Sequence, residues 1–455
     1  MDNNTSAPLG CTTVQPKNEK MEYTRNVEID ISMQDCHEAY IQPVNGVTNE
    51  GPYEFQMDSV RDSALDMNNM YMFMRAEVRD ENHATRKYNS NTDLTCTNFL
   101  LSTMWKSIEC RVNGHPINLS ASQHTGYKSL MQAMLAVDSA GAESLLPSMY
   151  TIESSSGAVY QSGASGTSSQ KRRKLLNLGK TFTMCGPIVG VDFLQSDALL
   201  APFNSLSLTF TRHDDQFIFS TPKVVASGNS LGAASIENKP KLIVHEFGIF
   251  CKRIQLTHSA LKSYFQPRAM QRYLSPLSEV HTYALTTGIT RKNIIVHTAN
   301  VLPKQVVIGM VKTSALVGNY NENPFNFQPF NLSKLALKVN AIRVPQEPLE
   351  PDWDNKLFAR EYIHLLNNTG RFKTPYGNGI TMDTFELGCT LFPFDLTADA
   401  CSSYHLHGGK EGILEIELEW KTALVDQITV VVMTSKDQIV TIDPNSMGTP
   451  AFNAF

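Results

Sequence analysis

Apolar and polar residues alternate with a period of two along many short stretches of this chain, which is the pattern of half-buried β-strands. The clearest stretch lies between 301 and 353, where Gln305–Val311 reads as one strand. A second strand follows, in which Leu335, Leu337 and Val339 alternate with polar or small residues. Many such strands with turn signals between them, and few helical patterns, favour a mainly β sandwich or barrel.

Three prolines follow the second of these strands: Pro345, Pro348 and Pro351. Proline has no backbone N–H to donate to a neighbouring strand. We therefore expect the chain to leave the sheet at this point.

One helix stands out among the predicted strands. Its apolar residues form a single stripe at i, i+3, i+4, i+7 and i+8: Tyr127, Leu130, Met131, Met134 and Leu135. Thr125 precedes the stripe as a capping residue. Such a stripe is typical of a helix that lies on a sheet or closes the end of a barrel, and it does not indicate a cofactor site.

The strand pattern occurs twice. Ser107–Gly114 has the same shape as Lys334–Ala341, and the two segments align at a constant offset. Further on, Val191–Leu194 matches Phe394–Thr397 in the same order. Two echoes in register indicate two copies of one fold, although short strand patterns also recur by chance in β-rich chains.

The predicted organisation has four parts. A flexible piece at 226–240 marks the best boundary between the two copies, and a Ser/Gly-rich basic insertion at 154–174 lies within the first. The expected parts are a polar arm at 1–25, a first jelly roll at 26–240, a second jelly roll at 241–445 and a tail at 446–455.

Composition narrows the class of protein. The chain has 455 residues, which is long for one core, and its net charge of −5 argues against a protein that holds DNA through its whole surface. No stretch is long and apolar enough to span a membrane, and the N-terminus does not resemble a signal peptide. Eight scattered cysteines without a C-x-x-C pair read as reduced intracellular thiols.

Two sequence patterns resemble catalytic or phosphate-binding motifs, but each lacks a feature that the motif requires. Ser230 lies in a G-x-S-x-G pattern, but the segment after it is too short and polar for the helix that a nucleophile elbow needs. Gly179-Lys180-Thr181 ends like a phosphate-binding loop, but Lys174 stands where that loop needs its first glycine. We therefore expect no enzyme activity, no catalytic residue, no cofactor and no metal.

A basic run closes the Ser/Gly-rich insertion, formed by Lys171, Arg172, Arg173 and Lys174. It fits a nuclear-import signal or a nucleic-acid contact. A solvated loop end explains it equally well.

Several segments together resemble a known family: LPKQVVIGMV, NPFNFQPFNL, PLEPDW and TLFPFDLTADA, with a looser match over residues 50–115. They resemble the capsid-type proteins of Maverick/Polinton elements and adintoviruses. The residues that carry the resemblance are Asn113, Gly114, Pro324, Phe325, Asn326, Phe327, Asn340, Pro345, Pro348, Pro351, Asp352, Phe394, Asp395 and Leu396.

The resemblance implies a hexon-like major capsid protein with a double jelly roll and a few short helices. Such subunits form homotrimers, whose pseudo-hexagonal capsomers tile an icosahedral shell around double-stranded DNA. The expected partners are neighbouring capsomers, penton and minor capsid proteins, and packaged DNA on the inner face. The expected location is the virion, after synthesis in the host cytoplasm, with the nucleus as an alternative assembly site.

Two alternatives stay open. A minor capsid or penton-type protein usually needs one jelly roll, and the repeat counts against it. A carbohydrate-binding β-sandwich would need clustered tryptophans, whereas Trp105, Trp353 and Trp420 lie far apart in the sequence.

Overall fold

The computed structural model describes residues 32–58, 60–80, 83–87, 94–117, 124–153, 167–220, 239–264, 270–374, 376–398, 409–443 and 450–454. The expected arm at 1–25, the piece at 226–238 and Ser230 lie outside these ranges.

The first half of the chain folds into two antiparallel sheets that face each other. Eight strands build them: β1 (Met33–Ile41), β2 (Tyr53–Met57), β3 (Ser63–Asp80), β6 (Trp105–Val112), β7 (His115–Pro116), β8 (Phe182–Pro187), β9 (Leu206–Arg212) and β11 (Pro240–Leu256). One sheet has the order β1-β11-β3-β8, and the other has the order β2-β9-β6-β7. Aromatic rings from both sheets fill the space between them, with Trp105, Phe210 and Phe247 within 5.5 Å of one another.

The second half repeats this arrangement strand for strand. Its strands are β13 (Leu277–Leu285), β14 (Arg291–Val301), β15 (Gln305–Lys312), β16 (Leu332–Val339), β17 (Ile342–Leu349), β18 (Leu391–Asp395), β19 (Glu411–Trp420) and β20 (Ile428–Lys436). They form the sheets β13-β20-β15-β18 and β14-β19-β16-β17. Strands in the same chain order thus occupy the same sheet positions in both halves, so each half is an eight-stranded jelly roll. We call them roll 1 and roll 2.

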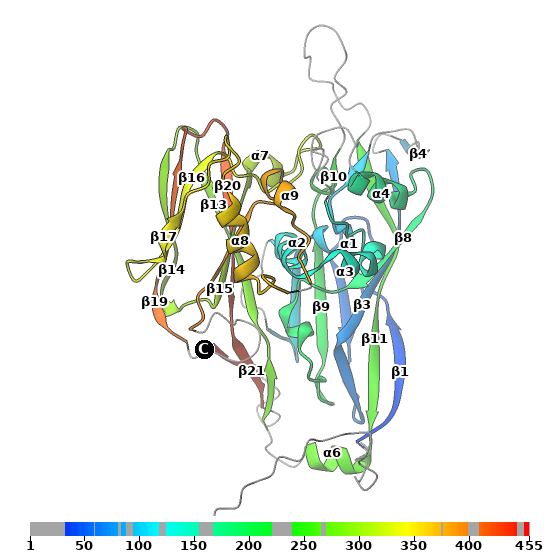
Figure 1. The fold of residues 1–455 in the computed structure, drawn as a ribbon. Coiled ribbons are helices and arrows are strands. Elements are labelled where there is room, and N and C mark those ends of the chain that lie inside the picture. The colour runs from blue at the N-terminus through cyan, green and yellow to red at the C-terminus, as the bar shows by residue number, and fades with distance from the viewer. Residues whose placement is uncertain are drawn as a thin grey trace, which may run out of the picture.

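Shorter elements connect and flank the rolls. The helices are α1 (Leu100–Thr103), α2 (Thr125–Ala136), α3 (Ser139–Ser144), α4 (Thr167–Leu176), α5 (Asp215–Ile218), α6 (His258–Tyr264), α7 (Thr313–Val317), α8 (Ala359–Asn368) and α9 (Met382–Glu386), with short 3-10 turns η2 (Leu146–Ser148) and η3 (Asp192–Gln195). The remaining strands are β4 (His83–Lys87), β5 (Thr95–Cys96), β10 (Phe219–Ser220), β12 (Gln271–Leu274), β21 (Gln438–Ile442) and β22 (Pro450–Ala454). Figure 1 shows the two rolls side by side, with α6 at one end of the molecule and α2 between the rolls.

The first pair of similar segments, Ser107–Gly114 and Lys334–Ala341, ends in the same turn in both rolls. Asn113 and Gly114 join β6 to β7 with φ of 52° and 82°, and Asn340 and Ala341 join β16 to β17 with φ of 50° and 68°. Two consecutive positive φ angles are what a tight type I′ hairpin turn requires. The Oδ1 atom of each asparagine accepts a hydrogen bond of 2.9 Å from the next strand over, from the N–H of Ser205 in roll 1 and of Ile413 in roll 2.

This duplication provides a matched test of backbone strain. Gly114→Ala should lower the free energy of unfolding by about 1–2 kcal/mol, because an L side chain disfavours positive φ, and no steric clash adds to this since no atom lies within 4 Å of the new Cβ. Ala341→Gly should change it in the opposite direction by a similar amount. Urea denaturation of both variants measures the two changes, and changes of equal sign would contradict the explanation.

Two sequence expectations about boundaries differ from the structure. The division at 240/241 would separate β11 from β3 and β1, with which it pairs, so we place the division between the rolls after Leu256. The expected tail at 446–455 contains β22, which pairs with β21.

The prolines do not mark an exit from the sheet. Pro345 and Pro348 lie within β17, and only Pro351 lies beyond its end. The order of the sheet places β17 at its edge, next to β16 alone. An edge strand has one side that needs no donors, which is why it accepts proline.

Candidate functional site

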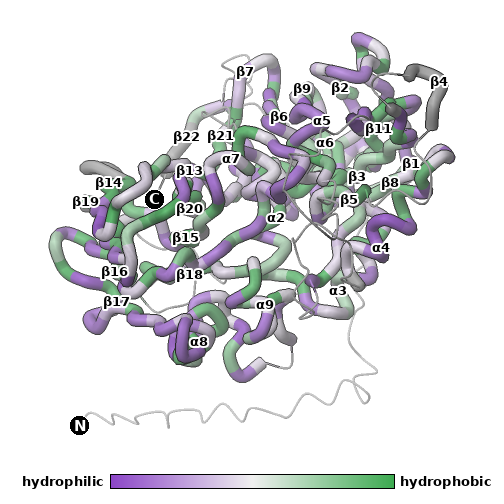
Figure 2. The backbone as a smooth tube through the Cα atoms, turned by 90° about the horizontal axis from the view of Figure 1, so that it is seen from above, coloured by the Kyte–Doolittle hydropathy of each residue, from purple (hydrophilic) through white to green (hydrophobic). Residues whose placement is uncertain are grey.

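Helix α2 is the element that joins the two rolls. The stripe predicted from the sequence is confirmed, since Tyr127, Leu130 and Met131 are fully buried. Most of its other residues are buried as well, because one side of the helix packs on roll 1 and the other lies against roll 2. Figure 2 shows α2 between the rolls from above. Thr125, expected as the cap, is the first helical residue, and the capping position is His124.

The segment Pro324–Phe327, noted in the sequence as a family motif, lies against α2. The Tyr127 hydroxyl donates a hydrogen bond of 2.6 Å to the carbonyl oxygen of Pro324. The Tyr127 ring lies 4.8 Å from the ring of Phe325 and 6.2 Å from that of Phe327. Because Tyr127 belongs to roll 1 and the phenylalanines to roll 2, this apolar cluster fixes one roll against the other. Asn326 is half-buried beside it.

Glycine in β15 makes room for this cluster. A Cβ atom at Gly309 would lie 2.6 Å from the Phe327 ring. Real Cβ contacts are never that short, so the ring rests directly on the strand backbone. The glycine in the sequence VVIGMV therefore lies where the Phe327 ring of the segment Pro324–Phe327 packs on β15.

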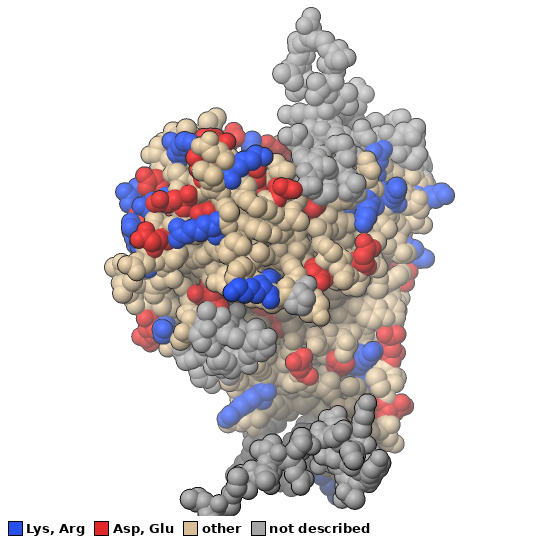
Figure 3. All heavy atoms as spheres, in the orientation of Figure 1, with Lys and Arg blue, Asp and Glu red and all other residues tan. Residues whose placement is uncertain are grey.

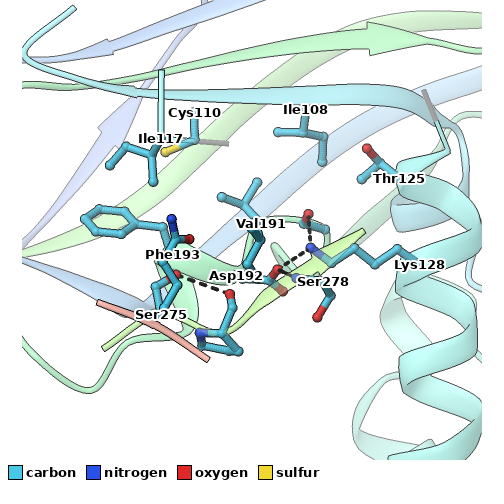
Figure 4. Close-up of a pocket in the computed structure, with 14 residues that line it drawn as sticks. Ile108, Cys110, Ile117, Thr125, Lys128, Val191, Asp192, Phe193, Ser275 and Ser278 are labelled. Atoms are coloured by element: carbon cyan, nitrogen blue, oxygen red, sulfur yellow. Dashed lines mark hydrogen bonds and ion pairs between the residues drawn. The ribbon is translucent and has the colours of Figure 1, made fainter. Parts of the chain in front are cut away.

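A buried ion pair forms the second part of the junction (Figure 4). The Lys128 Nζ atom in α2 lies 2.7 Å from Asp192 Oδ2 in η3, and both side chains are 5% exposed. The backbone N–H of Ser278 in β13 donates to the same oxygen at 2.7 Å. One carboxylate thus connects two segments of roll 1 with the first strand of roll 2. Removing either charge would leave the other buried, which is strongly unfavourable.

The cavity beside this ion pair is small. Its volume of about 30 Å³ has room for a water molecule, whereas pockets for small organic ligands measure roughly 300–1,000 Å³. A larger cavity of about 290 Å³ at the end of roll 2 is lined by Leu302, Asp395 and Leu396. At its wall Lys304 pairs with Asp437 at 2.6 Å, which neutralises both charges. Within the described ranges no three His, Cys, Asp or Glu side chains are grouped to hold a metal ion.

The remaining motif residues have structural positions. Phe394 is buried in β18, and the Asp395 carboxylate accepts hydrogen bonds from the N–H and hydroxyl of Thr397 at 2.9 and 2.6 Å. Asp352 lies 3.7 Å from the Lys421 ammonium. The second echo is looser than the first, because Asp192 lies in a 3-10 turn and Asp395 ends a strand. These residues hold loops in place.

The basic run is part of helix α4 and is therefore not the end of a solvated loop, while residues 154–166 of the insertion lie outside the described ranges. Arg172 is 1% exposed, and its guanidinium lies 2.9 Å from the buried Glu153 carboxylate. Lys171 is more than half exposed and lies 3.3 Å from Glu143. Arg172 is therefore inaccessible to DNA or to an import receptor. From the sequence alone the four basic residues cannot be told apart, because it does not reveal which side of the helix faces the core.

The outer face of the sheet β14-β19-β16-β17 is charged. Glu417 is fully buried beneath Arg291 and Arg343, whose guanidinium nitrogens lie 2.5 and 3.1 Å from it. Burial alone would raise the pKa of Glu417, but hydrogen bonds from these arginines and from Lys338 hold it below its usual value. Figure 3 shows charges of both signs interspersed over roll 2, and no basic field on that side. This face is suited to solvent.

Comparison with known proteins gives little at the level of sequence. No family model matches the chain. One curated relative, Uncharacterized protein F54H12.2 of Caenorhabditis elegans, is 24% identical over 145 residues, which is 31% of this chain. The match spans about a third (35%) of that protein's length.

Solved structures match over nearly the whole length. A chain of the Sputnik virophage particle, solved by cryo-EM, superposes with a TM-score of 0.62 at 14% identity, covering 99% of this chain and 94% of that one. The mavirus major capsid protein gives 0.53 at 11% identity, covering 100% and 96%. The Faustovirus major capsid protein gives 0.55 at 8% identity, covering 93% and 94%.

The chain is a double jelly roll. The matches span both rolls and the junction between them, as expected if the pair of rolls is the conserved unit. At such low identity they establish the fold, which confirms the expected architecture of two tandem eight-stranded rolls. Along the described parts of this double jelly roll, no helix is long and apolar enough to cross a membrane.

Proposed function

We propose that this chain is a major capsid protein without enzymatic activity, which assembles as a homotrimer into pseudo-hexagonal capsomers of an icosahedral shell around double-stranded DNA. The observation that supports it best is the whole-length match to double jelly-roll chains described as major capsid proteins. Two similar rolls per chain give six per trimer. Six similar lobes approximate a hexagon, which tiles a flat facet.

The motifs of the second half support a finer assignment to the capsid proteins of Maverick/Polinton elements or adintoviruses. Pro324–Phe327 packs between the rolls, where a change would alter the relative position of the two lobes. We propose neighbouring capsomers, penton and minor capsid proteins, and packaged DNA as partners, and the virion as the location. Cytoplasmic synthesis, with assembly there or in the nucleus, belongs to the same proposal.

The alternatives have less support. A single-roll penton or minor protein would not use the extensive contact of α2 with roll 2. A carbohydrate-binding sandwich needs an exposed aromatic platform, but all three tryptophans are at most 8% exposed. The described cavities also lack a groove lined by paired acids and tryptophan.

Light scattering after size-exclusion chromatography should give about three times the 50.6 kDa chain mass, or the mass of a much larger shell. A closed ring with heterologous contacts has a fixed subunit number, so the mass should stay constant over a wide range of concentrations. Negative-stain electron microscopy should show hexagonal particles. A chain that remains monomeric at high micromolar concentration would refute the proposal.

A further inference from the structure

In the sheet β13-β20-β15-β18 of roll 2, the strands β15, β20 and β18 are buried on both faces, whereas β13 at the edge is mostly half-buried. Successive residues of a strand point to opposite faces, yet Val306–Val311 in β15 and Ile428–Thr434 in β20 are buried throughout. The inner face packs on the core of roll 2. The outer face is covered by the Phe327 ring over Gly309, with Tyr127 of α2 packed against that ring. Roll 1 thus covers the outer face of a sheet in roll 2.

Among the residues that the structure describes, no segment covers the outer face of the corresponding sheet of roll 1, β1-β11-β3-β8, in this way. Four half-buried aromatic residues lie on its outer face: Tyr40, Tyr71, Phe73 and Phe250. The Phe250 ring lies 4.7 Å from Tyr40, 4.9 Å from Tyr71 and 6.3 Å from Phe73. We call these four residues the aromatic patch. A solvated sheet face is normally polar, so a cluster of this kind indicates a contact surface.

Polar groups form the rim of the aromatic patch. The Tyr40 hydroxyl donates to Glu246 at 2.9 Å, and the Tyr71 hydroxyl donates to Glu38 at 2.9 Å. Arg75 lies 3.1 Å from Glu246. An apolar centre with a paired polar rim is the usual composition of a protein–protein interface.

Helix α8 is the counterpart of α2 in chain order, since each is the first helix after the fifth strand of its roll. Whereas α2 is buried on both sides, only Glu361 and Leu365 of α8 are buried. Large apolar side chains are exposed on α8 or near it: Leu357, Ile363, Met382 and Leu387. We call these four residues the α8 face. Figure 2 shows α8 and β1 on the outside of the pair of rolls, away from α2.

We infer that the α8 face of one copy docks on the aromatic patch of the next copy. The chain already shows the contact once, because α2, the first helix after the fifth strand of roll 1, packs over the equivalent sheet of roll 2. Two copies of one fold leave one helix and one sheet without this contact, and the next copy supplies both. The inference rests on the proposed trimer, and it specifies which surfaces close the ring. Each contact is heterologous, so three copies close without a free face.

Two lysine substitutions test these surfaces. Phe250→Lys places a charge in the aromatic patch, and Ile363→Lys places one on the α8 face. The matched control is Ile295→Lys, which changes a 59% exposed isoleucine on the charged outer face of β14-β19-β16-β17. Light scattering should give the mass of a monomer for Phe250→Lys and Ile363→Lys. It should give the mass of a trimer for Ile295→Lys and for the wild type. The circular dichroism spectra of the wild type and the three variants should be the same. If Phe250→Lys does not fold, Tyr71→Lys takes its place as the variant of the aromatic patch.

Mixing the two defective variants gives the sharpest result. Phe250→Lys retains a working α8 face, and Ile363→Lys retains a working aromatic patch. One contact can then form between them, but neither chain can continue the ring, so the mixture should contain a 1:1 dimer of about twice 50.6 kDa. Two separate monomers in the mixture, or trimers in both variants, would overturn the inference while leaving the trimer intact. A monomeric wild type would instead refute the proposed function itself.

Discussion

Arg172→Ala should lower the free energy of unfolding of roll 1 by about 3–5 kcal/mol. The guanidinium lies 2.9 Å from Glu153 Oε1 and 2.6 Å from the Thr151 hydroxyl, and all three side chains are buried. Without Arg172 the Glu153 carboxylate stays in the interior and loses the guanidinium charge that lies 2.9 Å from it. The Ser168 hydroxyl, which donates to it at 2.6 Å, does not neutralise that charge. Urea denaturation followed by tryptophan fluorescence measures the loss.

Lys171→Ala is the control, because this lysine is one position away on the same helix and its pair with Glu143 is exposed at the surface. Exposed pairs contribute about 0–1 kcal/mol, so this variant should unfold close to the wild type. A double variant, Glu153→Leu with Arg172→Met, should recover much of the loss by replacing the ion pair with apolar contacts. Equal losses in both single variants would mean that the whole basic run acts together at the surface.

Acidification from pH 7 to pH 5 should lower the free energy of unfolding by about 3–4 kcal/mol through two histidines. Burial lowers the pKa of His213 to about 3, and nearby His124 and Lys106 add to the effect. Burial, with the Arg360 charge, lowers the pKa of His364 to about 4. Both are therefore neutral in the folded chain, while the unfolded chain binds protons below pH 6.5. The contribution of these two histidines to the free energy of unfolding is fully present above pH 6.5. It is lost as the pH falls toward the pKa values that the histidines have in the folded chain.

Phe substitutions separate the two contributions. His213 stacks on Phe217 at 3.8 Å, and the ring of His364 lies 4.8 Å from that of Phe394, so an aromatic ring fits both places. His213→Phe and His364→Phe should each remove about half of the change between pH 7 and pH 5, and the double variant should be nearly insensitive. Thermal melts at pH 7, 6 and 5 measure this. A pH dependence that survives in the double variant would assign the effect to other groups.

Local signals predicted the local structure well. The repeated segments that end at Asn113-Gly114 and Asn340-Ala341 form matching turns in the two rolls, and asparagine and glycine tolerate the positive φ that such turns need. The stripe from Tyr127 to Leu135 forms the expected helix for a similar reason, since its period follows from the backbone. Such features depend on neighbouring residues, and a single sequence contains them.

Contacts between distant segments could not be predicted. Nothing near Arg172 in the sequence shows that it faces Glu153, and nothing near Pro324 shows that it receives the Tyr127 hydroxyl. The boundary near 240 was wrong because β11 belongs to the sheet of β3, which precedes it by more than 150 residues. The continuous apolar runs VVIGMV and ITVVVM are typical of strands covered on both faces, so they point to the junction.

The covalent connection between the rolls also affects how assembly responds to concentration. Because roll 1 and roll 2 belong to one chain, α2 meets its sheet at an effective local concentration of about the millimolar range, whatever the amount of protein in solution. That contact can therefore form in a single dilute chain. Contacts between chains have no such advantage. The protein concentration at which rings first appear should therefore depend on the intermolecular surface alone, and selection can change that threshold without disturbing the fold of the individual subunit.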